Sequence, residues 1–119
     1  MTTPYTVLFV EDDIGVREST SAILALHDVR LFVAKDGYDA LDILAQEHVD
    51  VLFTDIVMPG LNGIDLAKRA LGYQPDLKVL FMTAYYSRAA EAQQLGKLIF
   101  KPLRMREIEA ELDELLAAR

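Results

Sequence analysis

The chain has 119 residues, which is the length of one ordinary domain. Hydrophobic residues make up 52% of it and charged residues 26%, a balance that supports a folded core and argues against intrinsic disorder. The net charge is −7, with 19 acidic against 12 basic residues, which argues against direct binding to nucleic acid. There is no cysteine, so disulfides and thiolate metal sites are excluded.

No segment of the sequence suggests a membrane anchor or a secretion signal. The apolar runs all fall short of the roughly 18 residues that a membrane span needs, and residues 1–4 carry neither a basic region nor an apolar core. No internal repeat, low-complexity tract or linker divides the chain. We therefore expect one soluble cytoplasmic domain over residues 1–119, with no output domain and no membrane contact.

The first half of the chain alternates between strand and helix patterns. Residues 5–10 are apolar and partly aromatic or β-branched, which predicts a buried strand. Residues 14–26 then return apolar side chains at helical spacing. A second strand is predicted over 30–34, a second helix over 38–46 and a third strand over 49–54.

The second half continues the same alternation. A third helix is predicted over 63–71, closing at a glycine, and a fourth strand over 78–82. A short alanine-rich helix follows over 87–95, then a brief strand over 98–100, and an apolar stripe over 105–116 marks the last helix. Five strand–helix units in succession predict an α/β fold, in which a parallel sheet has helices on both faces and right-handed crossovers.

Polar side chains follow all five predicted strands, and those after four of them suggest a common site. Glu11 and Asp12 follow the first strand, Asp55 the third, Thr83 the fourth and Lys101 the fifth. In open parallel sheets, functional groups gather beyond these carboxyl ends. Three carboxylates in one pocket repel each other unless a cation neutralises them, and Mg²⁺ suits oxygen ligands and phosphate. With a lysine and a hydroxyl to hold phosphoryl oxygens, the set predicts phosphoryl transfer to a carboxylate.

Two of these groups also have structural alternatives. Residues 11–13, taken alone, suit a solvated helix start where acids favour the helix dipole, and either Asp12 or Asp13 suits the N-cap. We assign the cap to Asp13 rather than a ligand role. Thr83 is expected to cap the fourth helix as well as to contact phosphate.

Four segments resemble the motifs of a known family. "VLFVEDD", "FTDIVMPGLNG", "FMTA" and "FKP", each at the end of a predicted strand, are similar to those of the response-regulator receiver domain of two-component signalling. The resemblance covers about residues 5–117. It implies a flavodoxin-like (βα)5 sandwich with sheet order 2-1-3-4-5, and a single receiver domain over residues 1–119.

The resemblance assigns the roles at the site. Asp55 matches the phosphoacceptor, and Asp12 and Asp55 match the carboxylate ligands of Mg²⁺ or Mn²⁺. Glu11 would support the ion through water, and the backbone carbonyl of Val57 matches the third protein ligand. The resemblance implies a phosphoacceptor domain that assists its own phosphorylation and slow autodephosphorylation, and not an enzyme.

Further matches concern the phosphoryl group and the partners. Thr83 and Lys101 match the residues that contact the phosphoryl group, and the Lys101–Pro102 peptide matches one that is often cis. The expected phosphoryl donor is a histidine kinase or a phosphotransfer protein. A downstream protein or a second copy would bind the 4-5 face, formed by the fourth helix, fifth strand and fifth helix.

The sequence departs from the family at its switch positions. Many members carry an aromatic residue three positions before the lysine, where this chain has Leu98. The short interval from Thr83 to Lys101 predicts a short or irregular fourth helix and resembles receivers of hybrid kinases. "FMTAYY", which includes Ala84, Tyr85 and Tyr86, also resembles a motif of some stand-alone receivers that lack the switch aromatic. There Tyr86 would replace the missing ring.

Other function classes were weighed against these residues. Leu98 and the short fourth helix favour, as an alternative, an interaction module that no longer needs phosphate. An aspartyl phosphatase usually needs a second acid two residues after the nucleophile, where this chain has Val57. A flavin site lacks its phosphate-cradling loop after the first strand. Since Val57 and Tyr85 are bulky, we expect slow loss of the phosphoryl group.

Overall fold

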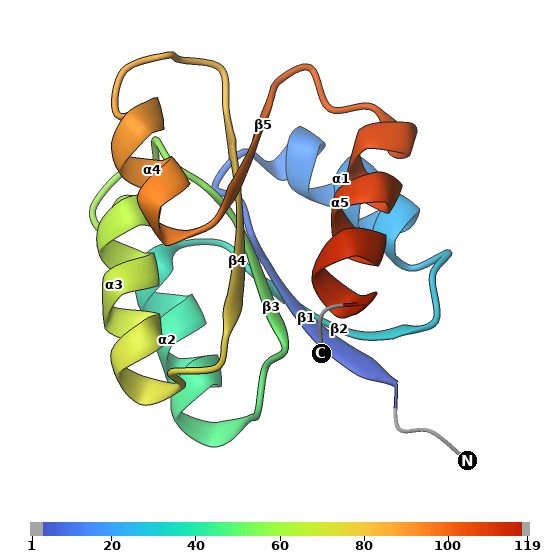
Figure 1. Ribbon diagram of the computed structural model, residues 1–119, viewed down its shortest axis with the longest axis horizontal. Coiled ribbons are helices and arrows are strands. Elements are labelled where there is room, and N and C mark those ends of the chain that lie inside the picture. The colour runs from blue at the N-terminus through green and yellow to red at the C-terminus, as the bar shows by residue number, and fades with distance from the viewer. Residues whose placement is uncertain (1–3, 118–119) are drawn as a thin grey trace.

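The computed structural model describes residues 4–117, so the two ends of the expected 1–119 domain lie outside the described residues. Strands and helices alternate strictly along this part of the chain (Figure 1). The elements are β1 (Tyr5–Val10), α1 (Ile14–Leu24), β2 (Val29–Ala34), α2 (Gly37–Gln46), β3 (Val51–Asp55), α3 (Gly63–Tyr73), β4 (Lys78–Thr83), α4 (Ala89–Leu95), β5 (Lys97–Phe100) and α5 (Met105–Ala117). The predicted succession of five strand–helix units is confirmed.

The five strands form one parallel sheet in the order β2-β1-β3-β4-β5, as the resemblance implies. Helices α1 and α5 cover one face, and α2, α3 and α4 cover the other (Figure 1). In the sheet, Val10 lies beside Thr54, and Asp55 lies beside Met82. This register brings the carboxyl ends of β1 and β3 next to each other.

Alternation along the strands divides the core into two clusters. Val7 and Phe9 of β1 belong to the cluster under α1 and α5, whereas Leu8 and Val10 belong to the cluster under α2, α3 and α4. Phe53 packs against Phe9 with ring centroids 5.1 Å apart. Glu11 and Asp55 follow Phe9 and Phe53 by two residues, so alternation directs their side chains to the α1/α5 face.

Three helices begin at a side chain that caps their first turn. The carboxylate of Asp13 accepts from the Val16 amide at 2.9 Å, so Asp13 is the N-cap of α1 and leaves Asp12 uncommitted. Asp36 and Asn62 cap α2 and α3 in the same way, accepting at 2.8 and 2.9 Å. Within residues 4–117, no helix combines the length and the apolar run needed to traverse a bilayer.

The first helix is shorter than the predicted 14–26 span. It ends at Leu24 because the amides of Leu26 and His27 donate to Ile23 and Leu24, only three residues back. Leu26, predicted as part of the apolar helix face, is 75% exposed. The predicted end of this helix was wrong because the spacing of apolar residues does not show which of them is the last to be buried.

The third helix, in contrast, runs past its predicted end. It continues through Gly72 to Tyr73, and Gln74 caps it. The Gln74 side chain accepts from the Val49 amide at 2.9 Å and donates to the carbonyls of Leu44 and Glu47 at 3.0 and 2.8 Å. These contacts tie the end of α3 to the end of α2 and to the segment that leads into β3, which offsets the cost of a glycine inside a helix.

The fourth helix is short, as predicted, with seven residues. Its N-cap is Arg88, which has a positive φ of 66° and makes no capping side-chain hydrogen bond. The expectation that Thr83 caps this helix was wrong, because five residues separate Thr83 from the first helical residue. Glu91 in its first turn binds Lys68 of α3 at 3.1 Å and Arg88 at 3.0 Å.

Each edge of the sheet carries a basic side chain. On β2, Arg30 lies 3.4 Å from Glu47 and packs over the ring of Phe32 at 4.8 Å. On β5, Lys97 lies 2.6 Å from Glu114 of α5.

Candidate functional site

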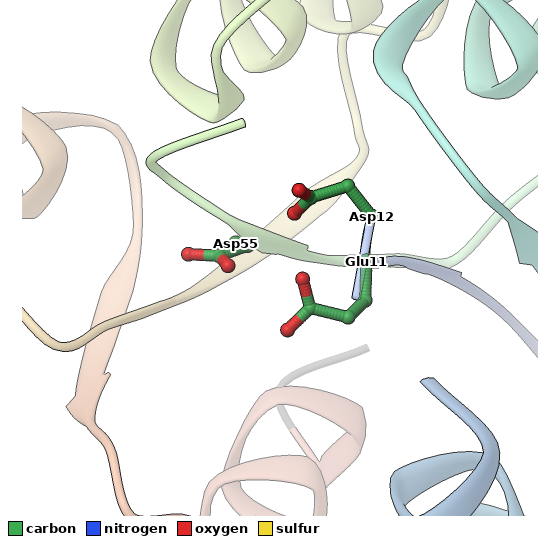
Figure 2. Close-up of side chains that lie close together, drawn as sticks. All are labelled: Glu11, Asp12 and Asp55. Atoms are coloured by element: carbon green, nitrogen blue, oxygen red, sulfur yellow. The ribbon is translucent and has the colours of Figure 1, made fainter. Parts of the chain in front are cut away.

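Three carboxylates meet at the carboxyl ends of β1 and β3 (Figure 2). Glu11 and Asp12 follow the last residue of β1, and Asp55 is the last residue of β3. One carboxylate oxygen from each side chain lies within 4.8 Å of the other two. The parallel register and the two-residue period produce this meeting, because Glu11 follows Phe9 and Asp55 follows Phe53 on the same face.

Lys101 enters the same pocket from the end of β5. Its ammonium nitrogen is 2.8 Å from Glu11 Oε1 and 2.8 Å from Asp55 Oδ2. The Glu11 side chain is fully buried, the Asp55 side chain is 7% exposed and the Lys101 side chain is 21% exposed. Because two buried carboxylates would repel each other, the lysine provides the positive charge that makes their proximity tolerable.

The pKa shifts agree with this arrangement. Burial lowers the pKa of Lys101, but the hydrogen bonds and charges of Asp55 and Glu11 outweigh it, so the pKa is raised and the ammonium stays protonated. The pKa of Asp12 is raised by burial and by its neighbour Glu11. The charged form of Asp12 is therefore disfavoured relative to an aspartate in water.

Arg17 of α1 supports the acidic loop, and the sequence analysis did not identify it. Its guanidinium donates to the backbone carbonyl of Glu11 at 2.9 Å and of Asp12 at 3.2 Å. The Asp13 amide donates to Glu11 Oε2 at 3.4 Å. The only signal in the sequence is an arginine one turn into the helix that follows the acids, and arginines at that place are common on exposed helix faces.

Thr83 is the last residue of β4, and its hydroxyl has a hydrogen-bond partner outside the carboxylate pocket. The buried Thr83 hydroxyl accepts from the Tyr85 amide at 3.1 Å, and its carbonyl accepts from the Lys101 amide at 2.8 Å. No hydrogen bond joins its hydroxyl to Lys101 or Asp55 within residues 4–117.

The residues proposed for switching or tuning differ in exposure. Val57 is 51% exposed, Tyr85 58% and Tyr86 80%, and Ala84 is exposed as well. Leu98 is half-buried and packs against the α2/α3/α4 cluster, so it occupies a core position rather than a surface one.

The ring of Tyr86 packs against Phe100, the residue before Lys101, with ring centroids 4.7 Å apart and planes tilted by 37°. That Tyr86 replaces the aromatic side chain missing at Leu98 stays a prediction. The Lys101–Pro102 peptide is cis, in agreement with the expectation.

The donor set fits a hard divalent cation. Three carboxylates supply oxygen only, which is the ligand chemistry of Mg²⁺, and the described residues place no softer ligand among them. Val57 follows Asp55 by two residues, at the start of the loop that leads to α3. Glu11, Asp12 and Asp55 are the carboxylates close enough together to hold such an ion, and a ligand role for the Val57 carbonyl stays a prediction.

Comparison with known proteins gives the family. The family model described as "Response regulator receiver domain" matches residues 7–113. The response regulator receiver protein CpdR of Brucella abortus (strain 2308) is 33% identical over 116 residues, covering 94% of this chain and 97% of that protein. Sporulation initiation phosphotransferase F of Bacillus subtilis (strain 168) is 32% identical over 94 residues, covering 77% and 76%.

Solved structures agree with this family at the level of the whole fold. A response regulator receiver domain protein (CheY-like) from Methanospirillum hungatei JF-1 superposes with a TM-score of 0.86 at 25% identity. The match covers 98% of this chain and 100% of that chain. With its flavodoxin-like sheet and its acidic cluster beside a lysine, this chain belongs to the response regulator receiver domain family of two-component signalling.

Proposed function

We propose that this receiver domain accepts a phosphoryl group on Asp55 from the phosphohistidine of a kinase or phosphotransfer protein. The observation that carries the proposal is the Lys101 ammonium, 2.8 Å from Asp55 Oδ2 in a pocket with two further carboxylates. A lone aspartate at a strand end would not need a half-buried lysine, whereas a phosphoacceptor needs positive charge where the phosphoryl oxygens will lie.

The transfer is a single displacement at phosphorus. A carboxylate oxygen of Asp55 attacks the phosphorus atom, the phosphorus–nitrogen bond breaks, and the imidazole leaves with the electron pair. The product is an acyl phosphate on Asp55. Lys101 holds one phosphoryl oxygen by its charge, and β3 keeps the attacking oxygen in line. Asp12, Asp55 and the Val57 carbonyl, with Glu11 in support, would hold Mg²⁺, which would supply positive charge to the phosphoryl oxygens.

Thr83 connects the reaction to the surface of the domain. Its hydroxyl accepts a hydrogen bond from the Tyr85 amide. Rotation of the hydroxyl toward a phosphoryl oxygen would change this hydrogen bond, which orders the loop before α4. Phosphorylation then shifts the population of loop conformations, with Tyr85 and Tyr86 moving together. The 4-5 face, formed by α4, β5 and α5, presents this change to a downstream protein or a second copy.

The surface around the pocket favours a protein as the phosphoryl donor. Large apolar side chains are exposed just beyond the carboxyl ends of several strands. They are Ile14, Val57, Tyr85, Tyr86 and Met105, with exposures of 63%, 51%, 58%, 80% and 44%. An apolar rim around an acidic pocket suits a docked protein better than a small phosphate ester.

Mass spectrometry after incubation with acetyl phosphate and Mg²⁺ tests the proposal. We expect one added phosphoryl group on the native protein and on Asp42→Asn, whose aspartate is exposed on α2. The Asp55→Asn variant should remain unmodified. An unmodified native protein, or a modified Asp55→Asn variant, would refute the assignment. If a beryllofluoride adduct forms but changes neither partner affinity nor the spectrum of the 4-5 face, the domain is instead a phosphorylation-independent interaction module.

A further inference from the structure

The backbone carbonyl of Asp55 is held by two neighbours that take no part in the chemistry. Thr54 donates a hydrogen bond to it, and the first residue of α3, Gly63, packs against it. We propose that Thr54 is a positioning residue for phosphoryl transfer, with Gly63 completing a clamp on the backbone of Asp55. This inference rests on the proposed function of Asp55.

The Thr54 hydroxyl lies where the β1–β3 ladder stops. The last register pair between these strands joins Val10 to Thr54, so Asp55 is one residue beyond it. On the other side, the ladder continues, since the Ile56 amide donates to the Met82 carbonyl at 3.0 Å. The fully buried Thr54 hydroxyl donates to the Asp55 carbonyl at 2.9 Å and so supplies a donor on the side where pairing with β1 has ended.

Gly63 closes the clamp from the start of α3. A Cβ atom at this position would lie 2.0 Å from the Asp55 carbonyl oxygen and 2.9 Å from Ile56 Cα. These are backbone atoms, so they cannot move aside as the end of a flexible side chain would. The Gly63 amide also donates to the Ile56 carbonyl at 2.8 Å. The helix therefore packs directly on the peptide group that carries the phosphoacceptor.

The clamp and the reacting group lie on opposite faces of β3. Alternation directs the Thr54 side chain toward the α2/α3/α4 face and the Asp55 carboxylate toward the α1/α5 face, where it meets Lys101. Asp55 is thus fixed by its carbonyl on one side and by its carboxylate on the other. A displacement of about 1 Å at a reacting group can cost roughly 100-fold in rate. A contact that fixes the backbone of Asp55 should therefore affect the rate of phosphoryl transfer.

Substitutions at Thr54 separate the hydroxyl from the shape of the side chain. Thr54→Val keeps the shape and suits a strand but removes the donor, whereas Thr54→Ser keeps the donor. Thr6→Val is the matched control, because Thr6 is also buried on a strand but lies at the opposite end of the sheet. The rate constant for phosphorylation by acetyl phosphate with Mg²⁺ is measured for all four proteins at a temperature well below each Tm.

We expect Thr54→Val to be phosphorylated roughly tenfold more slowly, with Thr54→Ser close to the native rate. Thr6→Val should keep the native rate even if its Tm falls as far as that of Thr54→Val. A native rate in Thr54→Val, an equally slow Thr54→Ser, or an equally slow Thr6→Val would overturn the role of the hydroxyl. A native protein that is not phosphorylated at all overturns the proposed function itself, so the two failures are distinguishable.

Discussion

We expect two exposed residues that follow strand ends, Val57 and Tyr85, to slow the access of water to the acyl phosphate. Val57 lies two residues after Asp55 and Tyr85 two residues after Thr83, and each side chain is more than half exposed. Both are larger than the water molecule that hydrolysis needs. Because both side chains are largely exposed, truncating them should have little effect on the fold.

Truncating either side chain should shorten the lifetime of the phosphorylated form. We expect Val57→Ala and Tyr85→Ala to lose phosphate roughly threefold faster, which is less than 1.4 kcal/mol of barrier. Tyr73→Ala is a matched control, since Tyr73 on α3 has the same 58% exposure as Tyr85. The decay of the phosphorylated protein by mass spectrometry is the measurement. Lifetimes unchanged in both variants would show that these side chains do not shield the phosphate.

The identities of the site residues could be predicted from the sequence, because Glu11, Asp12, Asp55 and Lys101 each follow a buried strand. What could not be predicted is the direction of a side chain at a strand end. Thr83 follows its strand in the same way, yet its hydroxyl meets the Tyr85 amide instead of the pocket. Arg17 was missed for a related reason, since a contact of its guanidinium with two backbone carbonyls leaves no pattern in the sequence.

Among the elements, α4 depends most on side-chain contacts for its position. It has seven residues, begins after a residue with positive φ and makes no side-chain cap. Glu91 in its first turn joins it to Lys68 of α3 and to Arg88. The order and number of elements followed from apolar spacing, whereas their ends did not, since α1 stops early and the Gln74 contacts carry α3 past Gly72.

The Glu91 contacts should make the order of α4 sensitive to acid. Hydrogen bonds from Lys68 and then Arg88 lower the pKa of Glu91 from its usual 4.5. A carboxylate with a lowered pKa contributes stability above its unfolded pKa, and this contribution is lost as pH falls through its folded pKa. Glu91→Gln should therefore speed amide exchange in α4 at pH 7, and the difference from the native protein should shrink once the pH falls below 4.5 and vanish below the folded pKa of Glu91.

The effect on α4 is read against Glu18→Gln, which changes an exposed glutamate of α1 and should leave α4 as it is. High salt should also reduce the difference in α4 amide exchange between the native protein and Glu91→Gln, because both partners of Glu91 are surface groups. An α4 exchange rate that is the same in Glu91→Gln and the native protein at pH 7 would mean that packing alone orders the helix.

At the scale of the whole molecule, the pocket carries its own counter-ion. The charge of Lys101 lies between Glu11 and Asp55 at 2.8 Å from each, so the domain does not depend on a metal ion to bring these acids together. Removing a divalent ion should therefore affect phosphorylation and leave the fold intact. A net charge of −7 over the chain makes this local compensation more important.

Lys101→Met should make the stability of the whole domain depend on Mg²⁺. Without divalent ions, we expect its free energy of unfolding to fall by about 1–3 kcal/mol, because buried carboxylates lose their partner. Mg²⁺ should restore part of this loss by binding the folded state, and the native protein should gain less. Lys35→Met, at an exposed lysine, is the control. Urea unfolding with and without Mg²⁺ measures the difference, and equal stability of Lys101→Met and the native protein would contradict this account.

The basic side chains on the two edge strands have a consequence for crowded solutions. An unpaired strand edge invites a strand from another molecule, and such continuation of a sheet leads to aggregates. Here Arg30 on β2 and Lys97 on β5 place charge at both edges, each beside a glutamate of a neighbouring element. Copies of this domain that meet at high concentration should therefore touch through their helices and remain separable.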